Sequence, residues 1–163
     1  MNRRALIALA ACALVAGCGD DAGPTAPSGA PLVFTALLSP ANEVPPVGNT
    51  ESGGRGAVQI TFTGGTAAFY YQLSGFPGST TIVGAHIHPA PAGVNGPVIL
   101  STGVSAAAPL VLPNGTAEFR VSGIPVDAAL VQAIVNNPGG YYFNVHSPLN
   151  SGGFARGQLT RIQ

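Results

Sequence analysis

Three histidines, His86, His88 and His146, are the residues of this sequence best suited to chemistry. The first two are separated by a single residue, within a segment rich in β-branched residues, and the third ends another such segment. Alternate side chains of a β-strand lie on one face, so the pair would project together, about 7 Å apart along the strand. Imidazole binds zinc and copper well, and three imidazoles would leave one coordination position open. The spacing therefore predicts a zinc or copper site.

A structural role is the alternative interpretation of the same residues. The first two histidines would then hydrogen-bond to loop 89–97, and His146 would hold loop 147–153 in the same way. The sequence offers no obvious fourth ligand, so both interpretations stay open. A His-x-His pair on a sandwich face is similar to the copper side of copper–zinc superoxide dismutases. With only three histidines, the bridging imidazole and the full zinc set are missing, so dismutase activity is not expected.

The histidine segments belong to a chain with an all-β pattern. Short runs of β-branched, aromatic and alternating residues are separated by glycine and proline. Along 81–88, the simplest interpretation buries Val83, Ala85 and Ile87 and places Ile82 on the outer face with the histidines. On 141–146, Tyr142, Asn144 and His146 share the outer face. The predicted strands are 33–38, 56–63, 66–74, 81–88, 98–102, 116–122, 141–146 and 156–162.

Turn and helix signals complete the fold prediction. Gly64-Gly65 and Asn114-Gly115 each lie between strand patterns and predict tight hairpins. Apolar residues at helical spacing predict one short helix over 127–137, with Asp127 as its N-cap and Pro138 after its end. About eight strands with frequent turns indicate an antiparallel β-sandwich.

The N-terminal residues have the features of a lipoprotein signal. Two arginines precede an apolar run that is too short to cross a bilayer, and the run contains Cys12. Small residues and Cys18 follow, which resembles the lipobox of bacterial lipoproteins. We expect a signal peptide over 1–17, a lipidated Cys18 with a Pro- and Gly-rich tether over 18–31, and one domain over 32–163. The protein would be exported and anchored by its lipid to the cell membrane or the outer membrane, with the domain outside the cytoplasm.

Charge is scarce and argues against several functions. Only 7% of the residues are charged and none is lysine, so a nucleic-acid partner is not expected. Arg156 is predicted to form a structural, bidentate ion pair with Glu43. No nucleophile elbow, phosphate loop or close carboxylate pair is present, so the protein is not expected to be an enzyme.

Four blocks of sequence stand out along the chain: NEVPP at 42–46, AHIH at 85–88, YFNVH at 142–146 and GFARGQL at 153–159. In type and order they resemble the blocks of the chordin-type (CHRD) domain. The resemblance implies an immunoglobulin-like β-sandwich found in extracellular and bacterial exported proteins. Phe154 stands where the last block often has glutamate, which puts any role of that acid in doubt here. We therefore expect a tethered, non-catalytic binding or structural module with an unknown protein or glycan partner, and a three-histidine zinc or copper module as the alternative.

Overall fold

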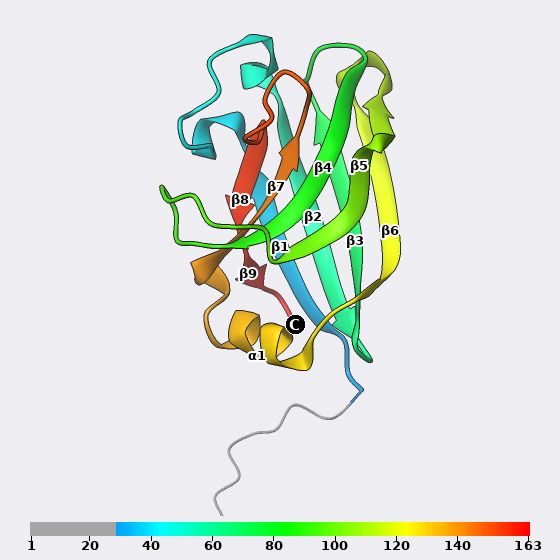
Figure 1. Cartoon of the computed structure of the whole chain (residues 1–163), viewed down its shortest axis with the longest axis vertical. Helices are drawn as coiled ribbons and strands as arrows, with labels where there is room; N and C mark the ends of the chain where they lie inside the picture. The colour runs from blue at the N-terminus through cyan, green and yellow to red at the C-terminus, as the bar shows by residue number, and fades with distance from the viewer. Residues whose placement is uncertain (1–28) are drawn as a thin grey trace, which may run out of the picture.

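Two antiparallel sheets form the domain in the computed structural model, which describes residues 29–163 (Figure 1). One sheet has the strand order β6-β3-β2-β1-β9 and the other β5-β4-β7-β8. This confirms the predicted all-β sandwich. The predicted signal peptide, the predicted lipidation site Cys18 and most of the predicted tether lie outside the described residues. The strands are β1 (Leu32–Leu38), β2 (Arg55–Thr63), β3 (Thr66–Ser74), β4 (Thr80–Pro89), β5 (Leu100–Leu112), β6 (Ala117–Pro125), β7 (Tyr141–His146), β8 (Ala155–Gln158) and β9 (Thr160–Arg161).

The predicted last strand, 156–162, is divided between the two sheets. β8 pairs with β7, whereas β9 pairs with β1 in the other sheet. The chain changes sheet at Leu159, which is buried and donates its backbone N–H to the carbonyl of Tyr141. The C-terminal segment therefore joins the two layers of the sandwich at one end.

One predicted hairpin is confirmed and the other is wrong. Gly64-Gly65 joins β2 to β3, whose pairing ends at Thr63 and Thr66. Asn114-Gly115 instead connects β5 to β6, which belong to different sheets. Pro113 has no N–H to continue a ladder, and the carbonyl of Gly115 accepts the N–H of Phe76. The turn is therefore a crossover between layers.

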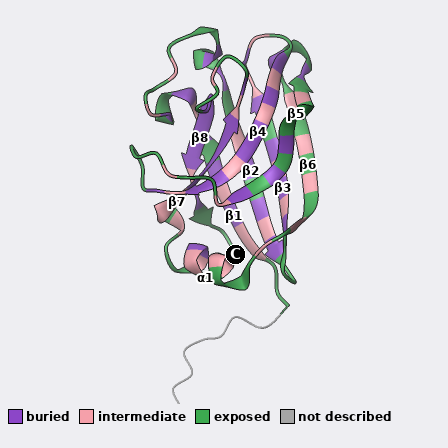
Figure 2. Cartoon of the chain, in the orientation of Figure 1, coloured by how far each residue is buried: buried purple, intermediate pink, exposed green. Residues whose placement is uncertain are grey.

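The core lies between the two sheets, where their inner faces meet. Phe143 of β7 lies 5.8 Å from Phe69 and 5.7 Å from Tyr71 of β3, measured between ring centroids. Figure 2 shows buried and less buried residues alternating along β2 and β3, as expected for strands with one face in the core. Aromatic contacts of this kind tie the histidine-bearing sheet to its partner.

The inward face of β4 changes partway along the strand. Ile82 is fully buried, as are Ala85 and Ile87, whereas Val83 is only half-buried. The predicted outward position of Ile82 and the predicted burial of Val83 are therefore wrong. The pairing of β4 with β5 shifts register on both sides of Gly84, and such an irregularity reverses the alternation. From Ala85 to His88 the predicted alternation is confirmed.

The single predicted helix is present at one end of the sandwich (Figure 1). Helix α1 spans Ala128–Asn136, and the Asp127 side chain accepts the N–H of Ala129 at 2.7 Å. Ile134 is its fully buried residue. No helix in residues 29–163 has both the length and the hydropathy to span a bilayer. Short 3₁₀ turns are η1 (Pro40–Asn42), η2 (Thr50–Gly53), η3 (Pro113–Gly115) and η4 (Pro138–Gly140).

Candidate metal centre

The three histidines come together on the outer face of the β5-β4-β7-β8 sheet. β4 and β7 are antiparallel neighbours, with Gly84 paired to His146 and His86 paired to Asn144. One ligand nitrogen from each histidine lies within 4.8 Å of the others. The centroid of the His86 ring is 4.8 Å from that of His146 and 5.8 Å from that of His88. The pairing of β4 with β7 therefore brings together the three histidines that the sequence analysis singled out.

Gly84 leaves space for two of the imidazoles. A Cβ atom there would lie 2.9 Å from Cε1 of His86 and 3.3 Å from Cδ2 of His146. Any side chain at this position would push the rings apart or outward. The glycine next to the cluster is therefore part of what allows the rings to approach each other.

Two of the imidazoles are held by backbone carbonyls of the loops beside them. Nδ1 of His88 lies 2.9 Å from the carbonyl of Gly96, and Nδ1 of His146 lies 2.9 Å from that of Ser151. A carbonyl only accepts, so each Nδ1 carries the proton and each Nε2 of a neutral ring has a free lone pair. The structural interpretation predicted loop contacts for His88 and His146, and these are present. For His86 it predicted a contact with backbone or with loop 89–97, whereas Nδ1 of His86 faces His146 instead. The two loop contacts also orient lone pairs toward the centre, as contacts to metal-binding histidines do.

The lone pairs meet in a small space. Nε2 of His88 is buried and has no hydrogen-bond partner among the described residues. Nε2 of His146 lies 3.0 Å from Nδ1 of His86. An unpartnered buried polar atom is costly, and a bound cation would offset that cost.

Burial lowers the pKa of two of the imidazoles, His86 and His146, and so favours their neutral form. The pKa of His86 is lowered to about 4, first by burial and then by the neighbouring His146 and His88. Burial also lowers the pKa of His146, although the hydrogen bond to Ser151 opposes the shift. Metal ligation requires the unprotonated nitrogen, so the same burial favours ligation.

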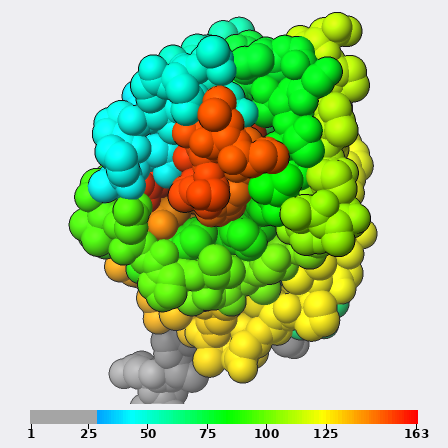
Figure 3. All heavy atoms as spheres, turned by 45° about the horizontal axis from the view of Figure 1, so that its top comes forward, coloured from blue at the N-terminus to red at the C-terminus, as the bar shows by residue number. Residues whose placement is uncertain are grey.

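The loop that covers His146 is anchored to the N-terminal part of the domain. Ser147 Oγ donates to Glu51 Oε2 at 2.6 Å, and the Asn150 amide donates to the same oxygen. Glu51 is only 4% exposed. Figure 3 shows this loop, near residue 150, packed beside the segment around residue 50. The contacts hold the carbonyl of Ser151 in place above the histidine.

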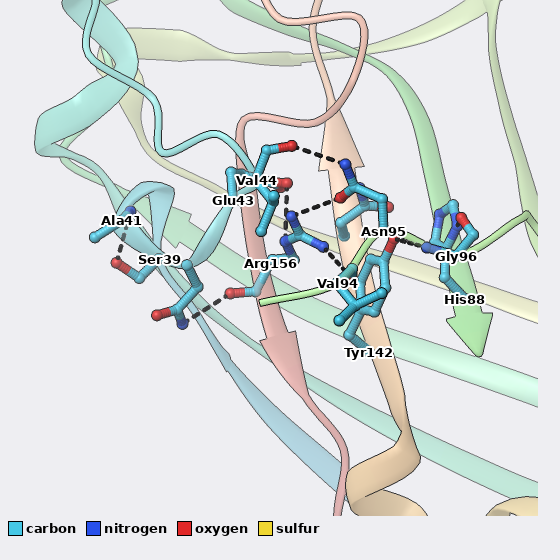
Figure 4. A network of polar contacts seen from close by, with 12 residues as sticks. Ser39, Ala41, Glu43, Val44, His88, Val94, Asn95, Gly96, Tyr142 and Arg156 are labelled. Atoms are coloured by element: carbon cyan, nitrogen blue, oxygen red, sulfur yellow. Dashed lines mark hydrogen bonds and ion pairs between the residues drawn. The ribbon is translucent and has the colours of Figure 1, made fainter. Parts of the chain in front are cut away.

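A second network lies beside the cluster and contains the predicted ion pair (Figure 4). Nε of Arg156 lies 3.1 Å from Oε2 of Glu43, and both side chains are at most 4% exposed. The predicted bidentate geometry is wrong, because the other guanidinium nitrogens bond to the Val94 carbonyl and to Asn95 Oδ1. Arg156 thus holds two parts of the chain in place, Glu43 and loop 90–99.

Tyr142 joins this network to the histidines. Its ring stacks on that of His88, with 4.8 Å between centroids and 3° between planes. The Arg156 guanidinium lies over the Tyr142 ring at 4.6 Å from its centroid. Glu43, Arg156, Tyr142 and His88 therefore form a continuous series of contacts.

Residues 34–159 match the family model of the CHRD domain. The chain belongs to the CHRD-domain family. A comparison with curated proteins gave no match.

The four blocks that resemble the CHRD domain meet at this network. Glu43 belongs to the first block, His88 to the second, Tyr142 to the third and Arg156 to the last. The contacts described above link each of them to the next. In this CHRD domain, residues distant in sequence therefore converge beside the histidine cluster.

Two residues of the CHRD domain's site were not singled out from the sequence. Tyr142 and Asn144 were placed on the same strand face as His146, which was the available signal. Neither a tyrosine nor an asparagine indicates a metal site by itself. Phe154 is fully buried and packs edge-on against Phe76 at 4.9 Å between centroids.

The carboxyl group of Glu43 is strongly affected by its surroundings. Burial raises its pKa to about 7, while Arg156 and a hydrogen bond with Asn144 act in the opposite direction. Asn144 thus lies between the acid of the CHRD network and the histidines, since its Oδ1 is 3.0 Å from Nε2 of His146.

Proposed function

We propose that this CHRD protein is an exported, lipid-anchored module that binds one zinc or copper ion through His86, His88 and His146. The observation that carries the proposal is the convergence of three imidazole nitrogens within 4.8 Å, one of them buried and without a hydrogen-bond partner in residues 29–163. An ion bound there would satisfy that lone pair. The anchor would be Cys18, and the domain would act outside the cytoplasm.

The proposed function is binding without catalysis. Three imidazoles form a suitable ligand set for zinc and copper. His86 and His146 are half-buried, so an ion can reach the site from solvent. The nearby buried carboxylates are engaged elsewhere, Glu43 with Arg156 and Glu51 with Ser147. Neither is positioned as a free general base, which supports a storage or transfer role for the ion.

Removing one histidine should abolish tight metal binding. We would titrate a protein that consists of residues 19–163 with zinc and with copper. This shortened protein lacks both cysteines, whose thiolates bind the same metals, and it retains every described contact. The wild-type protein should bind one ion, and His88→Ala should lose at least about 100-fold in affinity, more than the 10–100-fold that loss of a supporting contact costs.

Gln59→Ala is the matched control, because Gln59 is exposed on the other sheet. It should bind metal like the wild type. If the folded wild-type protein binds neither ion at micromolar concentration, the metal function is excluded. The tethered interaction module with a protein or glycan partner would then be the function to pursue.

The stability of the metal-free protein should depend on pH through His86. Its pKa is near 6.5 when unfolded and about 4 when folded, so in that window the unfolded chain binds the additional proton. Stability from this group is therefore present at pH 7 and is lost as the pH falls toward 4. We expect a loss of about 1–2 kcal/mol, reduced by partial solvent exposure of the ring.

Comparison with His86→Gln separates this effect from that of Glu43. Glu43 has a raised pKa, so the stability that it contributes changes with pH in the opposite sense. That contribution is lost as the pH rises from 4.5 through about 7. Urea unfolding at pH 4.5, 5.5 and 7 should show the advantage of the wild type over the variant shrinking as the pH falls. A constant difference across these pH values would contradict the prediction.

A further inference from the structure

Asn144 lies at the centre of the site although nothing in its residue type marks it as a ligand. It is two residues before His146 on β7 and pairs with His86 of β4, so it shares the outer face with both. Its side chain is only 2% exposed. Its Oδ1 lies 3.0 Å from Nε2 of His146, the nitrogen that also faces His86.

The contact between Asn144 and His146 brings two acceptors together. Nδ1 of His146 donates to the carbonyl of Ser151, so Nε2 of the neutral ring carries a lone pair. Oδ1 of an amide is also only an acceptor. Nδ1 of His86 can donate a proton to Nε2 of His146, but this proton lies between the two rings. It does not relieve the contact between Nε2 of His146 and Oδ1 of Asn144. A cation held by both atoms removes the conflict.

The other half of the amide explains why Oδ1 points toward the histidines. A Cβ atom at Gly153 would lie 2.6 Å from Nδ2 of Asn144 and 2.6 Å from Oε1 of Glu43. The amide nitrogen and the carboxylate oxygen therefore border the same space at Gly153, and the interaction with Asn144 lowers the pKa of Glu43. Turning the amide over would place its oxygen against the Glu43 carboxylate. The Glu43–Arg156 pair thus sets the orientation of Asn144.

We propose that the Asn144 amide oxygen is the fourth ligand, which makes the site a three-nitrogen, one-oxygen centre for a divalent ion such as Zn²⁺. The inference rests on the proposed function of the three histidines. Ligands at the usual zinc distances lie about 3.3 Å apart around a tetrahedral ion. The 3.0 Å separations of His146 Nε2 from His86 Nδ1 and from Asn144 Oδ1 are close to that value. An amide oxygen is a hard ligand, so it adds affinity for Zn²⁺ and little for Cu⁺.

The test compares Asn144→Leu with Asn144→Asp in residues 19–163. The leucine variant removes the oxygen at similar size and should weaken Zn²⁺ binding about 10–100-fold. The aspartate variant keeps an oxygen ligand and should bind Zn²⁺ at least as tightly as the wild type. With Co²⁺ as the probe, the visible spectrum should change in the leucine variant. Cu⁺ affinity should be the same in all three proteins. Asn144→Ala replaces the leucine variant if that variant does not fold.

Each result has one meaning. Equal Zn²⁺ affinity and equal Co²⁺ spectra in the wild-type and leucine proteins would overturn the ligand assignment and leave the three-histidine function standing. Equal weakening by leucine and by aspartate would also overturn it, because a positioning role does not distinguish oxygen from carbon. A folded wild-type protein that binds no metal would overturn the proposed function itself.

Discussion

Replacing Arg156 with methionine should destabilise the folded domain by about 3–5 kcal/mol at pH 8. The guanidinium is 3% exposed and is the charged partner of Glu43, so its removal leaves a carboxyl group buried without compensation. The carbonyl of Val94 and the side chain of Asn95 lose their donors as well. A loss of this size is a large part of the total stability of a small domain. Urea unfolding of the two proteins measures it directly.

The destabilisation should depend on pH, because Glu43 can take up a proton. Its pKa is already raised to about 7 by burial, and Arg156 is the main group that lowers it. Without Arg156 the pKa rises further, so the acid is neutral at pH 5 and the variant should regain stability there. Stability from a raised carboxyl pKa is lost as the pH increases. The variant should therefore be closer to the wild type at pH 5 than at pH 8.

The double variant Glu43→Gln, Arg156→Met is the control for this explanation. It carries a neutral amide in place of the acid, so the excess loss at pH 8 should disappear. A double variant as unstable at pH 8 as Arg156→Met alone would show that the buried charge is not the cause. The lost contacts of Arg156 with Val94 and Tyr142 would then account for the effect.

Gly115→Ala should cost at least about 3 kcal/mol, from two separate causes. Gly115 has φ +72°, a conformation that costs a residue with a side chain about 1–2 kcal/mol. A Cβ atom there would also overlap the backbone carbonyl of Phe76, which cannot move as a flexible side chain can. The crossover from β5 to β6 depends on this close approach, since Phe76 donates its N–H to the Gly115 carbonyl.

Gly64→Ala separates the two causes. Gly64 has φ +57°, and a Cβ atom there would have no neighbour within 4 Å. This substitution should therefore cost only the conformational energy, about 1–2 kcal/mol. Thermal unfolding of the wild type and both variants gives the comparison. If the two substitutions lower stability equally, the contact with Phe76 is not a significant constraint.

The parts of the fold that depend on local pattern were predictable from the sequence. The strand 66–74, the strand 141–146 and the helix capped by Asp127 follow from alternation, propensity and capping. The histidine cluster also followed, because the phase of His86, His88 and His146 placed them on outer faces. What the sequence does not determine is that β4 and β7 are neighbours in one sheet, and this adjacency is what brings the three histidines together.

The remaining features depend on contacts distant in sequence. Asn114-Gly115 has the composition of a hairpin, and only the approach of Phe76 makes it a crossover. The reversal at Val83 lies beside the register shifts in the pairing of β4 with β5, which are set by how the two strands meet. The orientation of Asn144 depends on the buried Glu43, more than 100 residues away in the chain. Residue type alone carries none of this information.

The irregularity in β4 has a consequence for insertions and deletions. The spacing between Ile82, which faces the core, and the histidine pair determines on which side of the sheet the two imidazoles lie. Ile82 and His86 are an even number of residues apart, so strict alternation would place them on the same face, and the irregularity keeps them on opposite faces. Deleting one residue between them would make the spacing odd, so that strict alternation alone would keep Ile82 in the core and the imidazoles on the outer face. Whether this stretch has an odd or an even number of residues therefore decides whether the metal site needs the irregularity in β4. Related chains can be sorted by that length before any of their structures is determined.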